Sequence, residues 1–112
     1  MEPTRKITPT ISYSIFVGGN PITAEKICRK YCDKKGFCVT ITPTKYVYSY
    51  GEEEGVIIGI INYPRFPKSK EELRSCAVEL AHKLVKKLNQ RSVSIQGPEE
   101  TEWFSWRDEK DE

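Results

Sequence analysis

Apolar and polar residues alternate in several short stretches of the chain, with the period of two that is typical of half-buried β-strands. In the first of these stretches, Tyr13, Ile15 and Val17 lie on one side. A later stretch is apolar on both sides, as expected of a central strand. The pattern predicts strands at residues 11–17, 37–42, 56–63 and 92–96, with residues 101–106 as an additional edge strand.

The two middle strands are expected to form a hairpin. The first of them bends at Pro43, because proline cannot donate to a central ladder of hydrogen bonds. Tyr46, Tyr48 and Tyr50 then continue on one face. Residues 51–55 hold three consecutive glutamates between two glycines, so we expect a solvated acidic tip there.

Two longer stretches have the period of an amphipathic helix. The first begins after Asn20, a suitable N-cap, and ends at Gly36, which readily adopts the left-handed conformation of a C-cap. The second begins with a capping box of Ser69 and Glu72 and continues to about residue 89. Each helix has one apolar face for a core, and in the first helix basic residues lie on the opposite side.

The order of these elements predicts an α+β fold. We expect the ferredoxin-like β-α-β-β-α-β arrangement, in which an antiparallel sheet carries two helices on one face, here with an extra C-terminal edge strand. The other face of the sheet is then free for a partner. We divide the chain into a flexible arm at residues 1–10, a single domain at residues 11–106 and a charged tail at residues 107–112.

Composition excludes several classes of protein. Of the 112 residues, 38% are hydrophobic and 30% are charged, which is usual for one globular domain. The apolar runs are far shorter than the roughly 20 residues of a membrane span, and the first residues lack the apolar stretch of a secretory signal. We therefore expect a cytoplasmic protein that makes no membrane contact.

The four cysteines match no standard zinc spacing, and in a reducing compartment they are expected to remain free thiols. The chain also lacks a cofactor motif, so we predict neither a metal nor a cofactor. The net charge of +2 is small for a nucleic-acid protein, and we expect no such partner. Basic helices suit a small anionic ligand or an acidic protein surface instead.

Two segments are candidates for ligand binding. Gly18, Gly19 and Asn20 precede the first helix, whose exposed N–H groups would attract an anion. Two glycines there are equally what any tight strand-to-helix turn needs. A second group, Tyr63, Arg65 and Phe66, lies on a stiff turn with two prolines and could stack a planar ring and bind a phosphate or carboxylate. Alternatively the two rings close the core while Arg65 is solvated.

Aromatic residues also suggest an interface. Tyrosine and tryptophan supply large contact areas with a polar group, so a homo-oligomer is one interpretation. The other is that these rings pack across the sheet of a single chain. The residues concerned are Tyr46, Tyr48, Tyr50, Trp103 and Trp106.

Residues 31–40, the segment Tyr46-Val47-Tyr48 and residues 61–67 together resemble small uncharacterised proteins encoded by bacteriophages and prophages. The resemblance implies a compact phage accessory protein, often non-enzymatic, that acts on host or defence components in the host cytoplasm. It implies no catalytic residues.

From the residues and this resemblance we expect a non-enzymatic protein that sequesters a small anionic, nucleotide-like ligand and so interferes with a host or anti-phage defence process. One alternative is an inhibitor that binds a host protein through its open sheet face or through Trp103 and Trp106. Another is a small nucleotide-processing enzyme, for which only His82, Tyr63 and the acidic tip offer acid–base groups.

Overall fold

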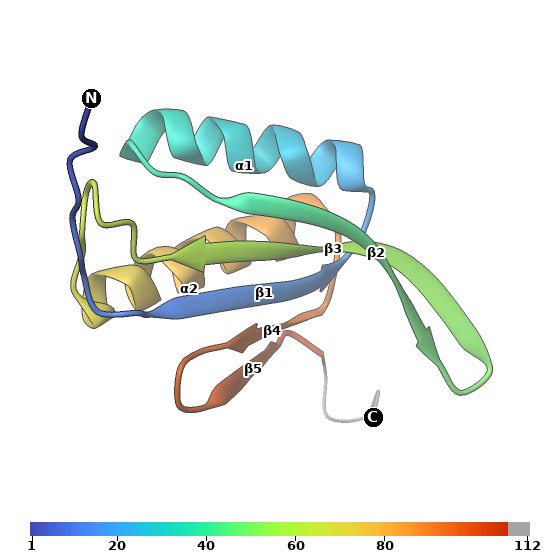
Figure 1. The fold of residues 1–112 in the computed structure, drawn as a ribbon. Helices are drawn as coiled ribbons and strands as arrows, with labels where there is room; N and C mark the ends of the chain where they lie inside the picture. The colour runs from blue at the N-terminus through green and yellow to red at the C-terminus, as the bar shows by residue number, and fades with distance from the viewer. Residues whose placement is uncertain (108–112) are drawn as a thin grey trace.

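The computed structural model describes residues 1–107 and contains five strands and two helices (Figure 1). The elements follow the order that the hydrophobic pattern predicts. Their bounds are β1 Ser12–Gly18, α1 Pro21–Lys35, β2 Thr40–Tyr48, β3 Gly51–Ile61, α2 Lys70–Lys87, β4 Ser92–Gln96 and β5 Thr101–Ser105. Except for Arg107, the predicted charged tail lies outside the described residues.

All neighbouring strands are antiparallel, and their order across the sheet is β2-β3-β1-β4-β5. Both helices cover the same face (Figure 1). The predicted ferredoxin-like α+β fold and its extra edge strand are therefore confirmed. The helices contact the three central strands, β3, β1 and β4, and leave the opposite face of the sheet open.

The core lies between the sheet and the helices. Ile15 of β1 pairs with Ile58 of β3 and with Ile95 of β4, and all three side chains point toward the helices. Leucines of α2 fill the other side of this layer. Burial of such side chains is worth about 1.5–3 kcal/mol each, which makes this layer the main source of stability. Its largest fully buried members are Ile15, Ile58, Ile60, Leu73, Leu80 and Leu84.

Capping residues set the helix ends as the sequence predicts. The Asn20 side chain accepts hydrogen bonds from the backbone N–H groups of Ile22 and Thr23 at 2.9 and 3.1 Å. Gly36 ends α1 in the left-handed conformation, with φ of 65°. Ser69 and Glu72 form the reciprocal capping box at the start of α2.

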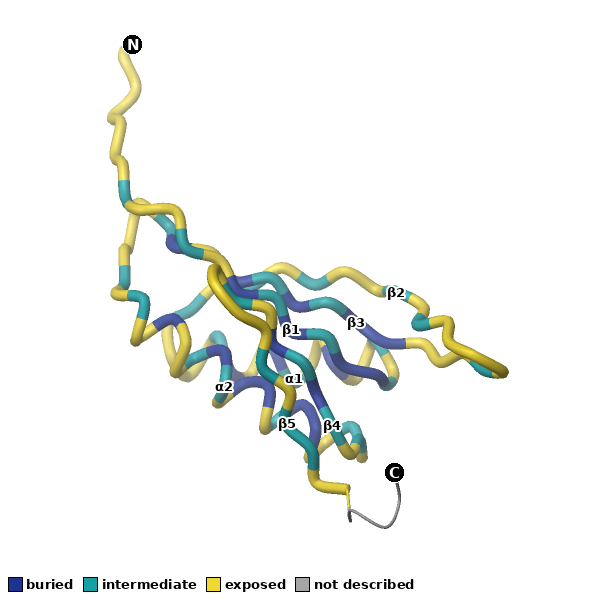
Figure 2. Tube along the Cα trace, turned by 90° about the horizontal axis from the view of Figure 1, so that it is seen from below, coloured by how far each residue is buried: buried dark blue, intermediate teal, exposed yellow. Residues whose placement is uncertain are grey.

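The β2–β3 hairpin differs from the prediction. β2 passes through Pro43 as one continuous strand, because β2 is the edge of the sheet and the missing N–H can face outward. The turn lies at residues 49–50, where Tyr50 has φ of 66°. The three glutamates are therefore part of β3 and do not form the tip. The hairpin extends beyond the core as a two-stranded ribbon with an exposed outer half (Figures 1 and 2).

A buried amide ties the N-terminal segment to the turn after β3. Asn62 is 6% exposed, and its side-chain nitrogen donates to the Thr8 hydroxyl and to the Pro9 carbonyl, each at 3.1 Å. Its side-chain oxygen accepts from the backbone N–H of Lys68 at 2.9 Å. Thr8 and Pro9 are thus held against the fold, although the sequence assigns them to a flexible arm. Within residues 1–107, neither helix is long and apolar enough to cross a membrane.

Candidate functional site

The face of the sheet that the helices leave open is made largely of small polar residues and glycines. Because side chains alternate along a strand, the residues between the core positions point to this face. Gly18 and Gly55 face each other across β1 and β3. Tyr46 pairs with Glu53 across β2 and β3. These two pairs lie in adjacent register at the end of the face where the hairpin leaves the core.

At this end the structure has a hollow of about 520 Å³, which we call the open-face basin. Its size falls within the range of small-ligand sites. It is bounded by the end of β1, the β2–β3 hairpin, the loop between α2 and β4, and Arg107. The lining residues are Phe16, Val17, Gly18, Tyr46, Tyr48, Glu53, Asn89, Gln90, Arg91, Ser92, Ser94 and Arg107.

The two glycines let the walls of the basin approach the sheet. A Cβ on Gly18 would lie 2.6 Å from Cδ of Glu53, and a Cβ on Gly55 would lie 2.5 Å from Cε2 of Tyr46. Real Cβ atoms do not approach other heavy atoms so closely, because dispersion turns to repulsion well before that distance. Absence of side chains at Gly18 and Gly55 therefore lets the carboxylate and the phenol ring lie directly over the sheet.

Tyr46 is held in place by its own hydroxyl. That hydroxyl donates to the Val56 carbonyl at 2.6 Å, so the ring is fixed at both ends. Burial raises the pKa of Tyr46, and the negative charge of Glu53 raises it further. Tyr46 is therefore a neutral aromatic wall at physiological pH and is unsuited to act as a base.

The basin carries charges of both signs. Its lining includes one acidic residue, Glu53, and two arginines, Arg91 and Arg107. The two arginines are brought together because the Trp106 N–H donates to the Arg91 carbonyl at 2.7 Å, which joins the end of β5 to the loop before β4. Aromatic walls with opposite charges fit a ligand that has a planar ring, a cationic group and an anionic group.

The predicted ligand residues fall at two separate ends of the sheet. Gly18 lies in the basin, whereas the N–H of Gly19 donates to the Glu54 carbonyl at 2.9 Å. The helix-start donors on which the predicted anion site depends are already bonded to Asn20. Tyr63 and the residues after it follow the far end of β3, eight residues beyond Gly55 and so about 26 Å along the strand direction.

At that far end the aromatic rings contact one another. The Tyr63 and Phe66 ring centroids are 5.3 Å apart, and the Cys38 thiol lies 3.5 Å from the Tyr63 hydroxyl as a donor. Arg65 is exposed. One chain therefore does not bring Arg65 to Gly18, Gly19 and Asn20, and the ligand role of the Tyr63, Arg65 and Phe66 group stays a prediction.

The residues predicted for an interface lie on opposite edges of the sheet. Tyr46 and Tyr48 line the basin, and Tyr50 is fully exposed at the hairpin turn. Trp103 is 56% exposed on β5. Trp106 packs edge-on against His82, with ring centroids 5.2 Å apart. An interface through all five residues would have to involve both edges, and the interface stays a prediction.

Sequence reasoning missed Glu53, Arg91 and Arg107. Glu53 was assigned to a solvated tip together with its neighbours. The period of two would have separated it from them. Along a strand Glu53 points to the same face as Gly55 and Ile57, which is the open face, whereas Glu52 and Glu54 point to the same side as the buried Val56. Arg91 and Arg107 lie in loops, where no periodicity applies.

Among residues 1–107 the structure has no group of three or more histidine, cysteine or acidic side chains that could hold a metal ion. All four cysteines are free, and Cys28 is buried. Burial raises the pKa of the Cys28 thiol to about 12.

No protein-family model matches the chain, and no curated protein matches it in sequence. Two phage proteins are among the solved structures that match its fold. A phage SAM lyase in complex with S-methyl-5'-thioadenosine has a TM-score of 0.74 at 19% identity, covering 96% of this chain and all of that one. A phage SAM lyase in the apo state has a TM-score of 0.71 at 21% identity, with the same coverage of both chains.

These neighbours correct the functional expectation. Both are phage proteins, in agreement with the phage context that the sequence resemblance implies, but both are enzymes. The expectation of a non-enzymatic protein that sequesters a ligand is contradicted by a fold match along nearly the whole chain to lyases. The third reading, a small enzyme acting on a nucleotide-like compound, agrees better with these matches. At this level of identity, what the comparisons establish for this chain is the fold.

Proposed function

We propose that this protein is an enzyme that cleaves SAM (S-adenosylmethionine) in the open-face basin. The observation that carries the proposal is the constellation of Glu53, aromatic walls and two arginines in one basin of ligand size, within a fold shared with phage SAM lyases. One of those lyases holds S-methyl-5'-thioadenosine, which is the thioether part of SAM.

The chemical groups of SAM correspond to the groups of the basin. SAM has a planar adenine, a sulfonium cation, and an amino acid end with an ammonium and a carboxylate. Rings of Phe16, Tyr46 and Tyr48 offer faces for stacking and for a cation. The carboxylate of Glu53 suits the sulfonium or the ammonium, and the guanidinium groups suit the substrate carboxylate.

Lyase chemistry on SAM breaks the bond between the sulfonium sulfur and the γ-carbon of the methionine part. The electron pair of that bond goes to sulfur, and neutral S-methyl-5'-thioadenosine leaves. The γ-carbon that has lost its bond to sulfur then forms a new bond by one of two routes. It bonds to an oxygen of the fragment's own carboxylate, which gives a lactone, or the fragment releases a proton from the neighbouring carbon, which gives an alkene. Neither route consumes water, an oxidant or a cofactor.

The positive charge on sulfur disappears as this bond breaks, so a site that only binds the cation would not speed the reaction. What the basin offers is orientation. Glu53 and the arginines would hold the amino acid end at two points, and the fixed Tyr46 ring would limit how the thioether part can turn. Tyr46 keeps its proton in this scheme, in keeping with its raised pKa.

The test is to incubate the purified chain with SAM and to measure S-methyl-5'-thioadenosine and the four-carbon product by liquid chromatography and mass spectrometry. We expect stoichiometric release of both. Glu53→Gln should lower kcat/KM by at least tenfold, because a hydrogen bond to a charged group is worth roughly 1.5–3 kcal/mol. Glu54→Gln is the matched control, since it makes the same change on the other face of β3, and it should change kcat/KM less than twofold.

Absence of the thioether product from the wild-type chain, in a preparation that is folded by circular dichroism, would refute the proposal. An equal loss in the Glu53→Gln and Glu54→Gln variants would refute the basin as the site. The ratio of lactone to alkene decides between the two routes and bears on neither conclusion.

Finer expectations accompany this proposal as predictions. They are a homo-oligomer that uses the exposed hairpin residues Tyr48 and Tyr50, a cytoplasmic location, and an effect on host or anti-phage defence through removal of SAM. Native mass spectrometry of the purified chain measures the first of these directly.

A further inference from the structure

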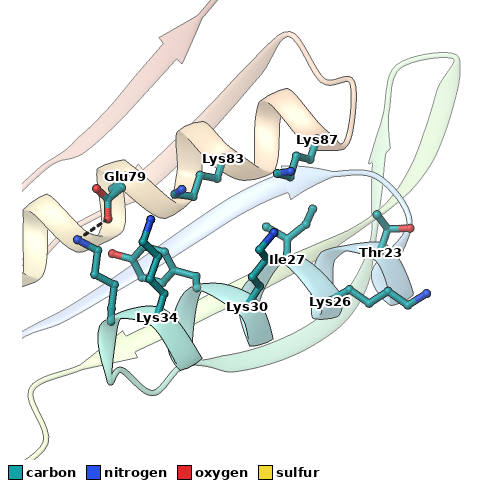
Figure 3. Close-up of a pocket in the computed structure, with 10 residues that line it drawn as sticks. Thr23, Lys26, Ile27, Lys30, Lys34, Glu79, Lys83 and Lys87 are labelled. Atoms are coloured by element: carbon teal, nitrogen blue, oxygen red, sulfur yellow. Dashed lines mark ion pairs between the residues drawn. The ribbon is translucent and has the colours of Figure 1, made fainter.

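A second hollow lies on the opposite side of the molecule, between α1 and α2 (Figure 3). We call it the interhelical groove. Its volume is about 640 Å³, and Ile27 and the buried Tyr31 contribute its apolar part. It shares no residue with the open-face basin, because the sheet separates the two.

Nearly all charged residues that line the groove are lysines. Lysines of α2 lie across from lysines of α1, as Figure 3 shows for Lys83 and Lys87 opposite Lys30 and Lys34. Glu79 is the only acidic residue of the lining, and it is paired with Lys35 at 3.3 Å. Among the described residues, no ion pair neutralises the five remaining lysines, Lys26, Lys30, Lys34, Lys83 and Lys87.

These lysines form two rows. Lys26, Lys30 and Lys34 are four residues apart along α1, and Lys83 and Lys87 are four apart along α2. Spacing of four places like charges about 6 Å apart on one side of a helix, where each pair destabilises the helix by roughly 0.2–0.5 kcal/mol. A chain of anions lying between the rows would remove this repulsion.

The chemistry of the rows suits phosphates. Lysine is a flexible point charge that binds a phosphate without requiring one orientation, whereas bidentate recognition of a carboxylate or phosphate is usually the task of arginine. The linear arrangement suits an extended ligand with regularly spaced charges. Tyr31 is 3% exposed and has no open face for stacking, so no base would be read.

We propose that the interhelical groove binds a single-stranded nucleic acid through its phosphate backbone, without sequence preference. This departs from the sequence-based expectation of no nucleic-acid partner, which rested on the small net charge of +2. The net charge does not show the groove, because its two rows of lysines come from helices that are separated by 34 residues of chain.

The test is fluorescence anisotropy of a labelled 20-mer of thymidine with the full chain at several salt concentrations. Five phosphate contacts give a slope of log K against log salt of about −3.5, so affinity should fall on the order of 100-fold between 50 and 200 mM salt. A strand of mixed sequence should bind within about threefold of the thymidine strand.

The variant Lys30→Gln/Lys83→Gln/Lys87→Gln removes three charges of the groove. We expect at least a tenfold loss of affinity at 50 mM salt and a slope weaker by about 2. The matched control Lys6→Gln/Lys45→Gln/Lys86→Gln has the same net charge but changes no residue of the groove, and it should lose less than threefold. Circular dichroism checks that both variants are folded.

Three results would overturn the proposal. The first is no binding by the wild-type chain at 50 mM salt, and the second is an equal loss in both variants. The third is binding of tripolyphosphate, measured by isothermal titration calorimetry, without binding of the strand, which would assign the groove to a small polyphosphate. SAM cleavage by the groove variant should equal that of the wild type, so failure here is distinguishable from failure of the proposed enzymatic function.

Discussion

The open-face basin and the interhelical groove lie on opposite sides of one sheet and have similar volumes, yet they are built by different means. In the basin, two glycines allow Tyr46 and Glu53 to lie over the backbone, and the lining includes residues of both charges. In the groove, flexible lysines surround a hollow whose shape they do not define. A hollow with fixed walls and mixed charge can select one small molecule, whereas a hollow with mobile charges of one sign selects only for charge density.

The largest expected difference between the two hollows is in how salt concentration affects ligand binding. Between 50 and 200 mM salt, affinity for the nucleic-acid strand should fall on the order of 100-fold. KM for SAM in the basin should change less than threefold over the same range. The amino acid end of SAM is a zwitterion, and its two charges would contact residues of opposite charge at short range, where salt screens weakly. Steady-state kinetics and anisotropy in the same buffers measure both. A KM that rises as steeply as the strand dissociation constant would mean that the basin also binds by charge alone.

Displacing the Tyr46 ring from the backbone is the next largest effect. Gly55→Ala places a methyl 2.5 Å from both the Tyr46 ring and the Val17 carbonyl oxygen, and the backbone cannot move aside freely. We expect kcat/KM for SAM to fall more than tenfold, with a loss of about 1–3 kcal/mol in the free energy of unfolding from overpacking. Strand binding at 25 °C should be unchanged, since the groove is on the other side. Urea denaturation gives the stability change.

Gly36→Ala is the control for the general effect of this substitution. Nothing lies within 4 Å of a Cβ at Gly36, although its φ of 65° makes alanine somewhat strained there. It should lower stability by up to about 1 kcal/mol and leave kcat/KM unchanged. Unaltered kcat/KM in Gly55→Ala would show that the position of the Tyr46 ring does not matter to the reaction.

Removing a single hydroxyl from the basin is the smallest effect. Tyr46→Phe keeps the ring but loses the hydrogen bond to the Val56 carbonyl. We expect stability to fall by about 1 kcal/mol and kcat/KM to fall two- to fivefold, with no change in the shape of the pH profile between pH 6 and 9. A profile that loses a basic limb in Tyr46→Phe would instead assign the phenol to proton transfer.

Local patterns determined most of the fold. Period-two alternation in residues 11–17 and 92–96 and the caps at Asn20, Gly36, Ser69 and Glu72 predict elements that the structure confirms, because these signals depend on neighbours in sequence. The hairpin was predicted less well. Proline and glutamate disfavour strands locally, but pairing of Pro43 with Val56 and of Tyr46 with Glu53 extends the ladder through both.

For function, the sequence by itself determined which residue types are available. It specifies an amphipathic α+β chain with basic helices and aromatic strands. Tertiary structure decided which of them meet. Glu53 and Arg91 are 38 positions apart in the chain and line one basin only because β3, β1 and β4 lie side by side. Lys30 and Lys83 face one another only because both helices cover one face. A site depends on contacts between distant segments, and those contacts are set by the packing of the whole sheet rather than by any local pattern.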